Sequence, residues 1–352
     1  MTKLFHSFLA ALQRNTFLWA MAAALVVAML LSLCIGAYQI SFSHVAHIAA
    51  ASLLPGELTS HAGWTEKEHV VVTLVRMPRI LLATLAGIGL GLSGAALQGM
   101  MRNPLVGPDL IGITSGASFG GVAAILAGAA PAVMVGSAFG GGLLALALAS
   151  GLARLSKGGG VLPLILAGVI VSAFFGSLVG LAKYVADPET KLPGIVYWLM
   201  GSFAGADGPK VWTLALPTLL GGAVLMGLRW RLNLLSLGDL DAVSLGAPVQ
   251  SLRWVLIGVI SLIIAAQVSV SGGVGWVGLV VPHFARMLVG PDHRRLLPAA
   301  ALLGGLYLLL MDDLARCLTR QELPIGLLTS LVGTPVFAVL FWKTQTKGWA
   351  HD

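Results

Sequence analysis

Two pairs of arginines are the residues of this sequence best suited to specific chemistry with a partner. Arg76 and Arg79 flank a Met-Pro pair in "HVVVTLVRMPRILLATLAGIGLG", at the edge of an apolar run, and Arg316 and Arg320 lie in "DDLARCLTRQELPIG". The planar guanidinium group matches the geometry of a carboxylate, so a surface patterned with arginines would suit an acidic partner. The alternative is that these long cationic side chains only snorkel at the ends of membrane spans.

Other reactive groups are sparse within the apolar runs. The main ionisable residues there are Asp312, Asp313 and His283, which lies in "VPHFAR". A lone histidine is more often a packing residue than a metal ligand, so we predict no metal site. The G-x-x-x-x-G-K-[ST] loop that cradles nucleotide phosphates does not occur, and no group of residues resembles a catalytic constellation. We expect a chain that is not an enzyme and binds no cofactor of its own.

The composition indicates which elements must position these residues. The chain has 352 residues, of which 57% are hydrophobic and 10% charged, and its mean hydropathy is +0.92. So few charges could not cover the surface of a soluble domain. Apolar runs of about 20 residues recur, each long enough to cross roughly 30 Å of hydrocarbon. Because backbone groups in lipid must be satisfied internally, these runs predict an all-α, polytopic membrane protein.

Ten such runs can be delimited between the charged residues, and they predict about ten transmembrane helices. The fourth is rich in glycine, and the eighth is short and contains Pro282. Aromatic residues around 197–203 predict a further partial helix. The ten expected spans are 17–38, 79–101, 109–128, 131–153, 161–184, 211–229, 252–271, 275–290, 296–315 and 324–342.

The charges between the spans are distributed unevenly. Thirteen of the 21 lysines and arginines fall on the side of the amino terminus, but only five of the 14 acidic residues do. By the positive-inside rule that side is cytoplasmic, and an even number of spans places both termini there. The arginines at 76, 79, 316 and 320 then lie on the outer side, where this rule gives no reason for them.

The segment 230–250 forms a long loop on the expected cytoplasmic side. Its apolar residues recur at helical spacing and are interrupted by Gly238 and Gly246, which predicts two short amphipathic helices joined at a glycine. One interpretation is an interfacial helix pair resting on lipid. The other is a docking element for a cytoplasmic protein, with Ser236, Asp239 and Asp241 facing outward.

A second inner loop follows the expected second span in "ALQGMMRNPLVGPDLIG". Asn103-Pro104 and Gly107-Pro108 stop a helix, because proline lacks the amide proton and restricts the residue before it. A tight structural loop would explain this pattern. A constriction formed by Asn103 and Leu105, which closes a pore from inside, would explain it as well.

Four blocks of the sequence closely resemble the FecCD-type permeases of ABC importers, a family that includes membrane subunits for ferric siderophores, haem and cobalamin. The blocks begin with "VRMPRILLATLAGIGLG", "SLGDLDAVSLG", "GWVGLVVPHFAR" and "ELPIGLLTSLVG", and they lie at 75–120, 236–246, 275–305 and 322–342. They occur in the expected order, and the resemblance extends through nearly the whole chain after about residue 20. It implies a single transmembrane permease domain over 1–352.

The resemblance also implies the partners. Such permeases have ten helices per subunit and pair as dimers, here expected to be homodimers, in the inner membrane of a prokaryote. They bind two copies of a cytoplasmic ATPase, which holds ATP and Mg²⁺, and one extracytoplasmic solute-binding protein. Apart from these proteins and membrane lipid we expect no partner, and in particular no nucleic acid.

Site residues carry over by motif from the resemblance. Arg76, Arg79 and Arg316, with Arg320 beside them, would meet acidic residues of the binding protein. The fifth helix and the segment after it would line the pathway at the dimer axis, and Asn103 and Leu105 would belong to the inner gate. The block that would form the coupling helices in the ATPase grooves contains Ser236, Leu237, Gly238, Asp239, Leu240, Asp241, Leu245 and Gly246.

One departure from the family pattern bears on the cargo. Cobalamin-type members carry a Thr-Ser pair at the inner start of the fifth helix, where this chain has Val161 and Leu162 followed by Pro163. The gate differs there, and cobalamin becomes a less favoured cargo than an iron chelate, either a ferric siderophore or haem, while molybdate stays open. An ion-coupled secondary transporter is the alternative from another class, but the coupling block and the scarcity of intramembrane acids disfavour it.

Overall fold

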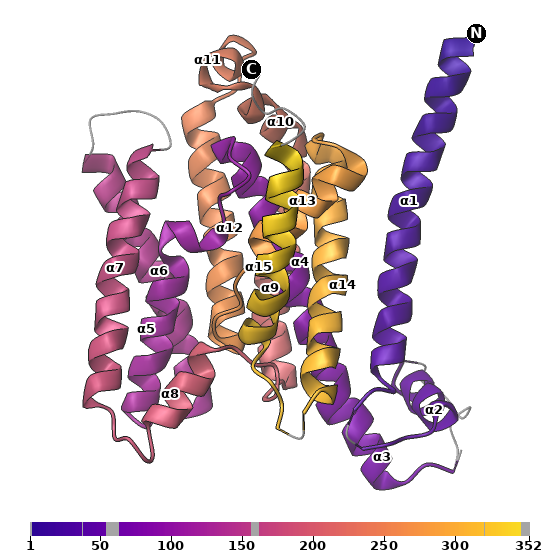
Figure 1. Cartoon of the computed structure of the whole chain (residues 1–352), viewed down its shortest axis with the longest axis vertical. Helices are drawn as coiled ribbons and strands as arrows, with labels where there is room; N and C mark the ends of the chain where they lie inside the picture. The colour runs from indigo at the N-terminus through magenta and orange to yellow at the C-terminus, as the bar shows by residue number, and fades with distance from the viewer. Residues whose placement is uncertain (1, 37, 54–62, 156–161, 320, 346–352) are drawn as a thin grey trace.

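The computed structural model describes residues 2–36, 38–53, 63–155, 162–319 and 321–345, and within these ranges the regular structure is helical throughout (Figure 1). The elements in chain order are α1 (Thr2–Ser32), α2 (Phe42–Leu53), α3 (Glu66–Val70), the π-helix η2 (Val71–Arg76), α4 (Met77–Met101), the 3-10 helix η3 (Pro108–Ile111), α5 (Ile113–Leu126), α6 (Pro131–Leu155), α7 (Leu162–Val185), α8 (Leu192–Leu199), α9 (Gly208–Gly227), α10 (Arg229–Leu237), α11 (Asp239–Ser244), α12 (Val249–Ser271), α13 (Val277–Val289), α14 (His293–Cys317) and α15 (Ile325–Gln345).

The apolar helices coincide with the ten expected spans. In the described parts of the chain, six helices are long and apolar enough to cross a membrane, and four shorter apolar helices accompany them. The glycine-rich run forms α6, and the short run with Pro282 forms α13. The prediction of an all-α, polytopic membrane protein is confirmed.

The helix of the second span begins well before residue 79, where the expected span begins. The helical segment instead starts at Glu66, where Thr65 and Glu68 form a capping box, and continues to Met101. Proline lacks an amide proton and normally disrupts the hydrogen bonds of the preceding turn. The π-helical turn η2 ends at Arg76, two residues before Pro78, and widens the helix there. Arg76 therefore lies within a continuous helix rather than before one.

The partial helix predicted around 197–203 lies slightly earlier in the chain. Helix α8 begins with Pro193 in its first turn and ends at Leu199. Gly201 follows with a φ of 76°, a conformation that favours glycine and ends the helix.

Helices α4 and α14 pack closely against each other. Gly87 and Gly91 on α4 face Ala300 and Gly304 on α14, so both helices present small residues four apart. A Cβ atom on Gly87 would lie 2.1 Å from the Gly304 carbonyl oxygen. Small residues let helix backbones approach this closely in membranes, and the resulting van der Waals contacts hold the pair together.

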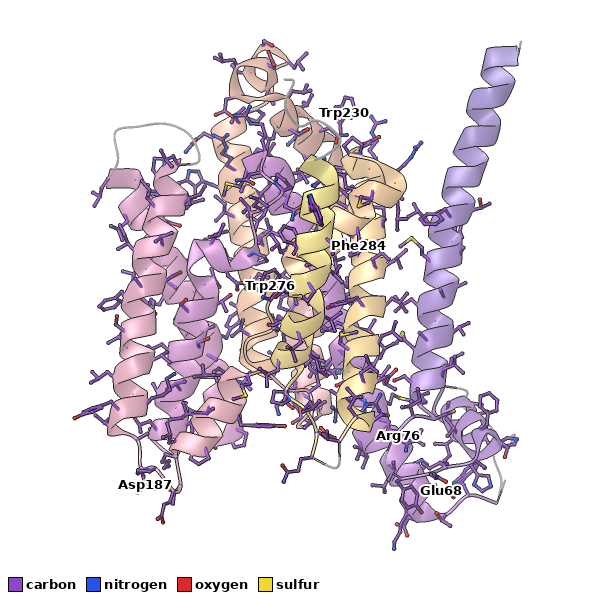
Figure 2. All side chains as sticks on the ribbon, viewed as in Figure 1. Glu68, Arg76, Asp187, Trp230, Trp276 and Phe284 are labelled. Atoms are coloured by element: carbon purple, nitrogen blue, oxygen red, sulfur yellow. The ribbon has the colours of Figure 1, made fainter. Side chains whose placement is uncertain are left out.

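The two ends of the bundle carry different elements. The beginning of α1 and the last turns of α15 lie at the end that also bears α10 and α11, while α2, α3 and α8 lie at the opposite end (Figure 1). Trp230 of α10 accordingly lies far from Glu68, Arg76 and Asp187 (Figure 2). The two ends of the described chain thus share one face, as an even number of spans requires.

Candidate functional site

Arg79 lies in a buried ion-pair cluster at the end opposite α10 and α11. Its side chain is only 6% exposed. Nε donates to both carboxylate oxygens of Asp312 at 3.0 Å, and Nη2 donates to Asp312 Oδ1 at 2.9 Å. Nη1 donates to the two oxygens of Glu322 at 2.8 and 2.7 Å. One guanidinium group therefore links α4, α14 and the segment that precedes α15.

Arg316 joins the same cluster from the last turn of α14. It pairs with Asp313 and, at 3.3 Å, with Asp312. It also donates to Ser32 Oγ at 2.8 Å and to the Ile35 carbonyl oxygen at 3.1 Å. Since the Ser32 hydroxyl donates in turn to Asp313 at 2.5 Å, the cluster holds the end of α1 against α14.

Arg76 binds the same end of α1 without contacting a carboxylate. Its guanidinium donates to the Leu33 carbonyl oxygen at 2.7 Å and to the Tyr38 carbonyl oxygen. The last carbonyl groups of a helix lack partners within the helix, and basic side chains commonly satisfy them. Arg76 thus caps α1.

These residues form one group, which we call the arginine cluster: Arg76, Arg79 and Arg316 with Asp312, Asp313 and Glu322. Its arginines neither form a free cationic surface nor extend along the membrane edge toward water. The three arginine side chains are directed into the protein, and only the Glu322 carboxylate is substantially exposed, at 37%. Docking of a partner by these arginines stays a prediction, and Arg320 lies outside the described residues.

At the other end, α10 and α11 have the two-helix form that the sequence predicts. They join at Gly238, which adopts a φ of 125°. Leu232, Leu235 and Ala242 are fully buried and anchor the pair on the bundle. The exposed apolar residues, which we call the α10–α11 tip, are Leu237, Leu240, Val243 and Leu245.

The polar residues of this block differ in their surroundings. Asp239 forms an ion pair with Arg253 of α12 at 2.5 Å, so it links α11 to α12 and does not face outward freely as predicted. Asp241 is exposed, as expected, and Gly246 adopts a φ of 79° after α11. Ser236 is exposed, and its hydroxyl donates to the Asn233 carbonyl oxygen at 2.7 Å.

A hydrogen-bonded joint connects α10 to α14, and sequence reasoning missed it. The Asn233 amide donates to Asp292 Oδ1 at 2.6 Å, and Asn233 Oδ1 accepts from the His293 backbone N–H at 2.9 Å. Asp292 also accepts from the Arg294 N–H at 3.0 Å and caps α14. Arg294 stacks on Trp230, with Cζ 4.1 Å from the ring centroid. The sequence signal that could have indicated this helix cap is Asp292, an aspartate directly before an apolar helical run.

The electrostatics of this joint favour the ionised carboxylate. Partial burial alone would raise the pKa of Asp292, but the hydrogen bonds from the Arg294 N–H and the Asn233 amide outweigh it. The charges of Arg294 and Arg295 act in the same direction, so the pKa of Asp292 lies below its ordinary value.

The residues expected to form a gate lie in two places, in the inner loop after α4 and at the start of α7. Asn103 Oδ1 accepts from the Leu105 backbone N–H at 2.9 Å, and the Leu105 side chain is exposed. Leu162 is exposed at the first residue of α7, while Val161 lies outside the described residues. A Cβ atom on Gly238 would lie 3.2 Å from Arg102 Nη1, so the beginning of this loop reaches the coupling-helix block.

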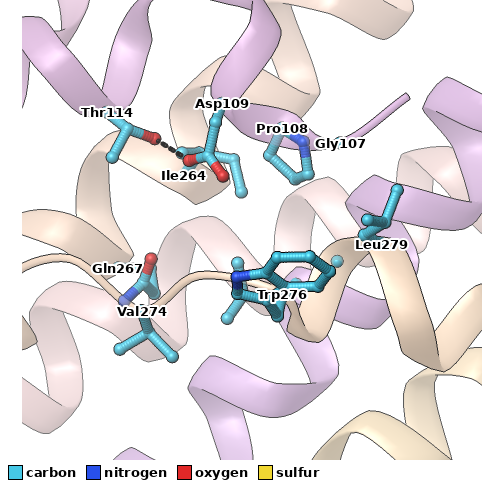
Figure 3. A pocket seen from close by; sticks show the side chains of 11 residues that line it. Gly107, Pro108, Asp109, Thr114, Ile264, Gln267, Val274, Trp276 and Leu279 are labelled. Atoms are coloured by element: carbon cyan, nitrogen blue, oxygen red, sulfur yellow. Dashed lines mark hydrogen bonds between the residues drawn. The ribbon is translucent and has the colours of Figure 1, made fainter. Parts of the chain in front are cut away.

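An open cavity of about 330 Å³ lies between α8, α15 and the segment that joins α12 to α13, and no sequence pattern predicts it. A smaller pocket adjoins it, and Asp109, Thr114 and Val274 line both (Figure 3). Thr114 Oγ1 donates to Asp109 Oδ1 at 2.8 Å. The remaining residues that line the larger cavity are Leu199, Met200, Gly273, Gly275, Gly326, Leu327 and Ser330.

Comparison with known proteins agrees with this architecture. The model of the FecCD transport family matches residues 24–343. The molybdate import system permease protein MolB of Haemophilus influenzae is 43% identical over 333 residues, which cover 94% of this chain and 96% of MolB. The hemin transport system permease protein HmuU of Yersinia pestis is 40% identical over 286 residues, which cover 78% of this chain and 83% of HmuU.

A solved structure confirms the likeness in three dimensions. It is an inward-facing conformation of a metal-chelate type ABC transporter, with a TM-score of 0.83 and 42% sequence identity. The match covers 94% of this chain and 99% of the other. These matches extend over nearly all of the ten apolar helices. The chain belongs to the FecCD transport family and is a multi-pass membrane permease of the ABC importer type.

Proposed function

We propose that this chain is the permease subunit of a binding-protein-dependent ABC importer and that a separate ATPase, in two copies, docks on the α10–α11 tip. The exposed apolar tip is the observation that carries this proposal. Leu240 is 88% exposed, and Leu237, Val243 and Leu245 are each more than half exposed. Burying one such side chain contributes roughly 1.5–3 kcal/mol, so a partner that covers the tip would gain substantial binding energy.

The surroundings of the tip favour a protein partner over lipid. The exposed Asp241 lies between Leu240 and Val243 in the chain, and a carboxylate is disfavoured in the hydrocarbon layer. The buried leucines of α10 and the ion pair of Asp239 with Arg253 fix the tip to the bundle. A rigid element of this kind can transmit a movement of the ATPase. The excess of Lys and Arg on this side supports a cytoplasmic position for the tip and both termini.

The opposite end would then receive the solute-binding protein. The proposed docking residues are Arg76, Arg79, Arg316 and Arg320. Because Arg79 is saturated by Asp312 and Glu322 in the isolated chain, a carboxylate of the partner could reach it only by displacing Glu322. Docking would therefore exchange one ion pair for another, and the arginine cluster would respond to the partner.

The cargo we favour is an iron chelate, either a ferric siderophore or haem. The likeness to HmuU, a hemin permease, supports this class. Molybdate is the second candidate, because MolB is a molybdate permease and is 43% identical over 94% of this chain. Uptake measured separately with ferric siderophore, haem, cobalamin and molybdate would decide between them.

The mechanism follows from the two docking surfaces. The loaded binding protein docks at the arginine cluster, ATP binding closes the ATPase pair, and the tip transmits this movement to the bundle. Each partner shifts the equilibrium between outward and inward access by its differential affinity for the two states. A second copy of the chain would complete the pathway at the dimer axis.

The experiment is co-purification of the ATPase with variants of the tip. Exchanging Leu237 and Leu240 for aspartate should release the ATPase from the permease in detergent, because charged residues then replace the apolar contacts. Leu318→Asp is the matched control, since Leu318 has almost the same exposure as Leu237, 57% against 56%, but lies at the opposite end of the molecule. Continued co-purification with the Leu237 and Leu240 variants would exclude docking on the tip.

A further inference from the structure

Two interruptions of the helices meet inside the bundle. The first is the segment 107–112 between α4 and α5, and the second is the segment 272–276 between α12 and α13. Both line the smaller pocket (Figure 3). A Cβ atom on Gly278 would lie 2.7 Å from Pro108 Cδ, so the first segment packs against the start of α13, directly after the second segment.

The first of these segments lies at membrane depth. A Cβ atom on Gly168 would lie 2.2 Å from the Leu110 carbonyl oxygen, and Gly168 lies six residues beyond the start of α7 at Leu162. At 1.5 Å per residue, this places the first interruption about 9 Å inside the end of that helix. Non-helical backbone at such depth is tolerated where it is buried in protein or lines a cavity, and broken helices mark binding sites in membrane transporters.

Asp109 is the charged residue that this arrangement presents to the cavity. Asp109 is exposed, and it lines both the open cavity and the smaller pocket. Thr114 donates to Oδ1 and orients the carboxylate, which leaves Oδ2 available for a ligand. Among the described residues that line the two cavities there is no lysine, arginine or histidine.

A carboxylate at membrane depth without a cationic neighbour favours one class of ligand. It attracts cationic groups and hydrogen-bond donors, and it repels anions. The cavity of about 330 Å³ has room for polar groups of a ligand beside this carboxylate.

We propose that Asp109, oriented by Thr114, is a cargo-contact site that takes a cationic or hydrogen-bond-donating group, such as an ammonium, amide or hydroxyl on the outside of a metal chelate. This inference rests on the proposed function and deepens it, because it selects among the cargo classes. A free oxyanion such as molybdate is the cargo that this site disfavours.

The electrostatic part of the proposal can be tested without any cargo. Cys34 and Cys317 are replaced by serine, Ser330→Cys places a thiol in the wall of the cavity, and the purified full chain in detergent reacts with thiosulfonate reagents. An ethylammonium reagent and an ethylsulfonate reagent of similar size are compared. With Asp109 present the cationic reagent should react faster, and Asp109→Asn should lower the ratio of the two rates on the order of tenfold.

The ratio of the two labelling rates also provides the control and the outcomes that would contradict the proposal. Asp187→Asn, a change of an exposed acid in the loop after α7, should leave the ratio unchanged. An unchanged ratio in Asp109→Asn, or a thiol at 330 that reacts with neither reagent, would overturn the proposal. Because labelling needs neither the ATPase nor the binding protein, this result is independent of the importer function.

A transport measurement then links the site to the cargo. Vesicles with the complete importer are supplied with the ferric complex of a linear trihydroxamate that ends in a free ammonium, with its neutral N-acetylated form, and with molybdate. Asp109→Asn should lower the uptake rate of the ammonium chelate about tenfold relative to that of the neutral form. Where the importer transports molybdate, the same substitution should raise the uptake rate of molybdate. Equal effects on all transported species would contradict a contact role, while absence of ATP-dependent uptake of any cargo by the unmodified importer would count against the proposed function instead.

Discussion

At the scale of single residues, Arg79 shows what a sequence can and cannot reveal about a charged side chain. The pattern around it predicts a fixed cation at the edge of a span, and the structure places it at such an edge. Its partners Asp312 and Glu322, however, are 233 and 243 residues away in the chain. No local spacing indicates that pairing. The interpretation of Arg79 as a free docking group therefore overlooked the acids that already satisfy it within the chain.

Substitution of Arg79 separates a structural role from a docking role. Arg79→Ala removes one partner of a buried ion pair and leaves Asp312 with Arg316 as its remaining cation. The cost of breaking such a pair is about 3–5 kcal/mol, so the melting temperature of the purified permease should fall. Glu322→Gln is the matched control, because Glu322 is more exposed and its ion pair with Arg79 should contribute little. An unchanged melting temperature combined with loss of binding-protein-stimulated ATPase activity would show that Arg79 serves docking alone.

At the scale of elements, hydrophobic runs predicted the apolar helices well because lipid leaves the backbone few alternatives to a helix. Shorter elements outside the apolar runs were less predictable. Helices α2 and α3 have mixed composition, and the π-helical turn before Pro78 depends on how the backbone adjusts to a proline inside a longer helix. The pair α10 and α11 could be predicted, since a helical apolar pattern with a glycine at its centre is a strong local signal.

The joint between α10 and α14 should make stability depend on pH. The folded-state pKa of Asp292 lies below its ordinary value, so its ionised form contributes stability above the unfolded-state pKa near 3.9. This contribution is lost as the pH falls through the folded-state pKa. Thermal unfolding between pH 5 and pH 3 should therefore show a smaller decrease in melting temperature for Asp292→Asn than for the unmodified chain.

The substitution is specific for charge, because asparagine is also a good helix N-cap. Asp241→Asn, a change of an exposed carboxylate on α11, is the control for the general effect of removing an acid from this end. An acid-induced decrease of equal size in Asp292→Asn and the unmodified chain would contradict a stabilising role for the ionised Asp292.

At the scale of the whole molecule, the fold class and the family could be predicted from composition and from four separated blocks of sequence. The cavity could not. It arises because the segment with Asp109 meets the segment between α12 and α13, and the sequence shows each only as a break in a helix. In the same way, the proximity of Gly238 and Arg102 joins the α10–α11 pair to the inner loop, although the two are far apart in the chain.

This proximity predicts how the inner loop should respond to the ATPase. If a docked ATPase moves the α10–α11 tip on binding nucleotide, as we propose, the loop that begins at Arg102 should move with the tip. The access of water to Leu105, which is 48% exposed in this structure, should then change. A cysteine at 105, in a chain without native cysteines, should therefore react with a thiol reagent at different rates in nucleotide-free and ATP-bound importer. Leu318→Cys at the opposite end provides a comparably exposed thiol outside this loop. Equal rates at 105 in both nucleotide states would show that the inner loop is a fixed turn and that the gate lies elsewhere.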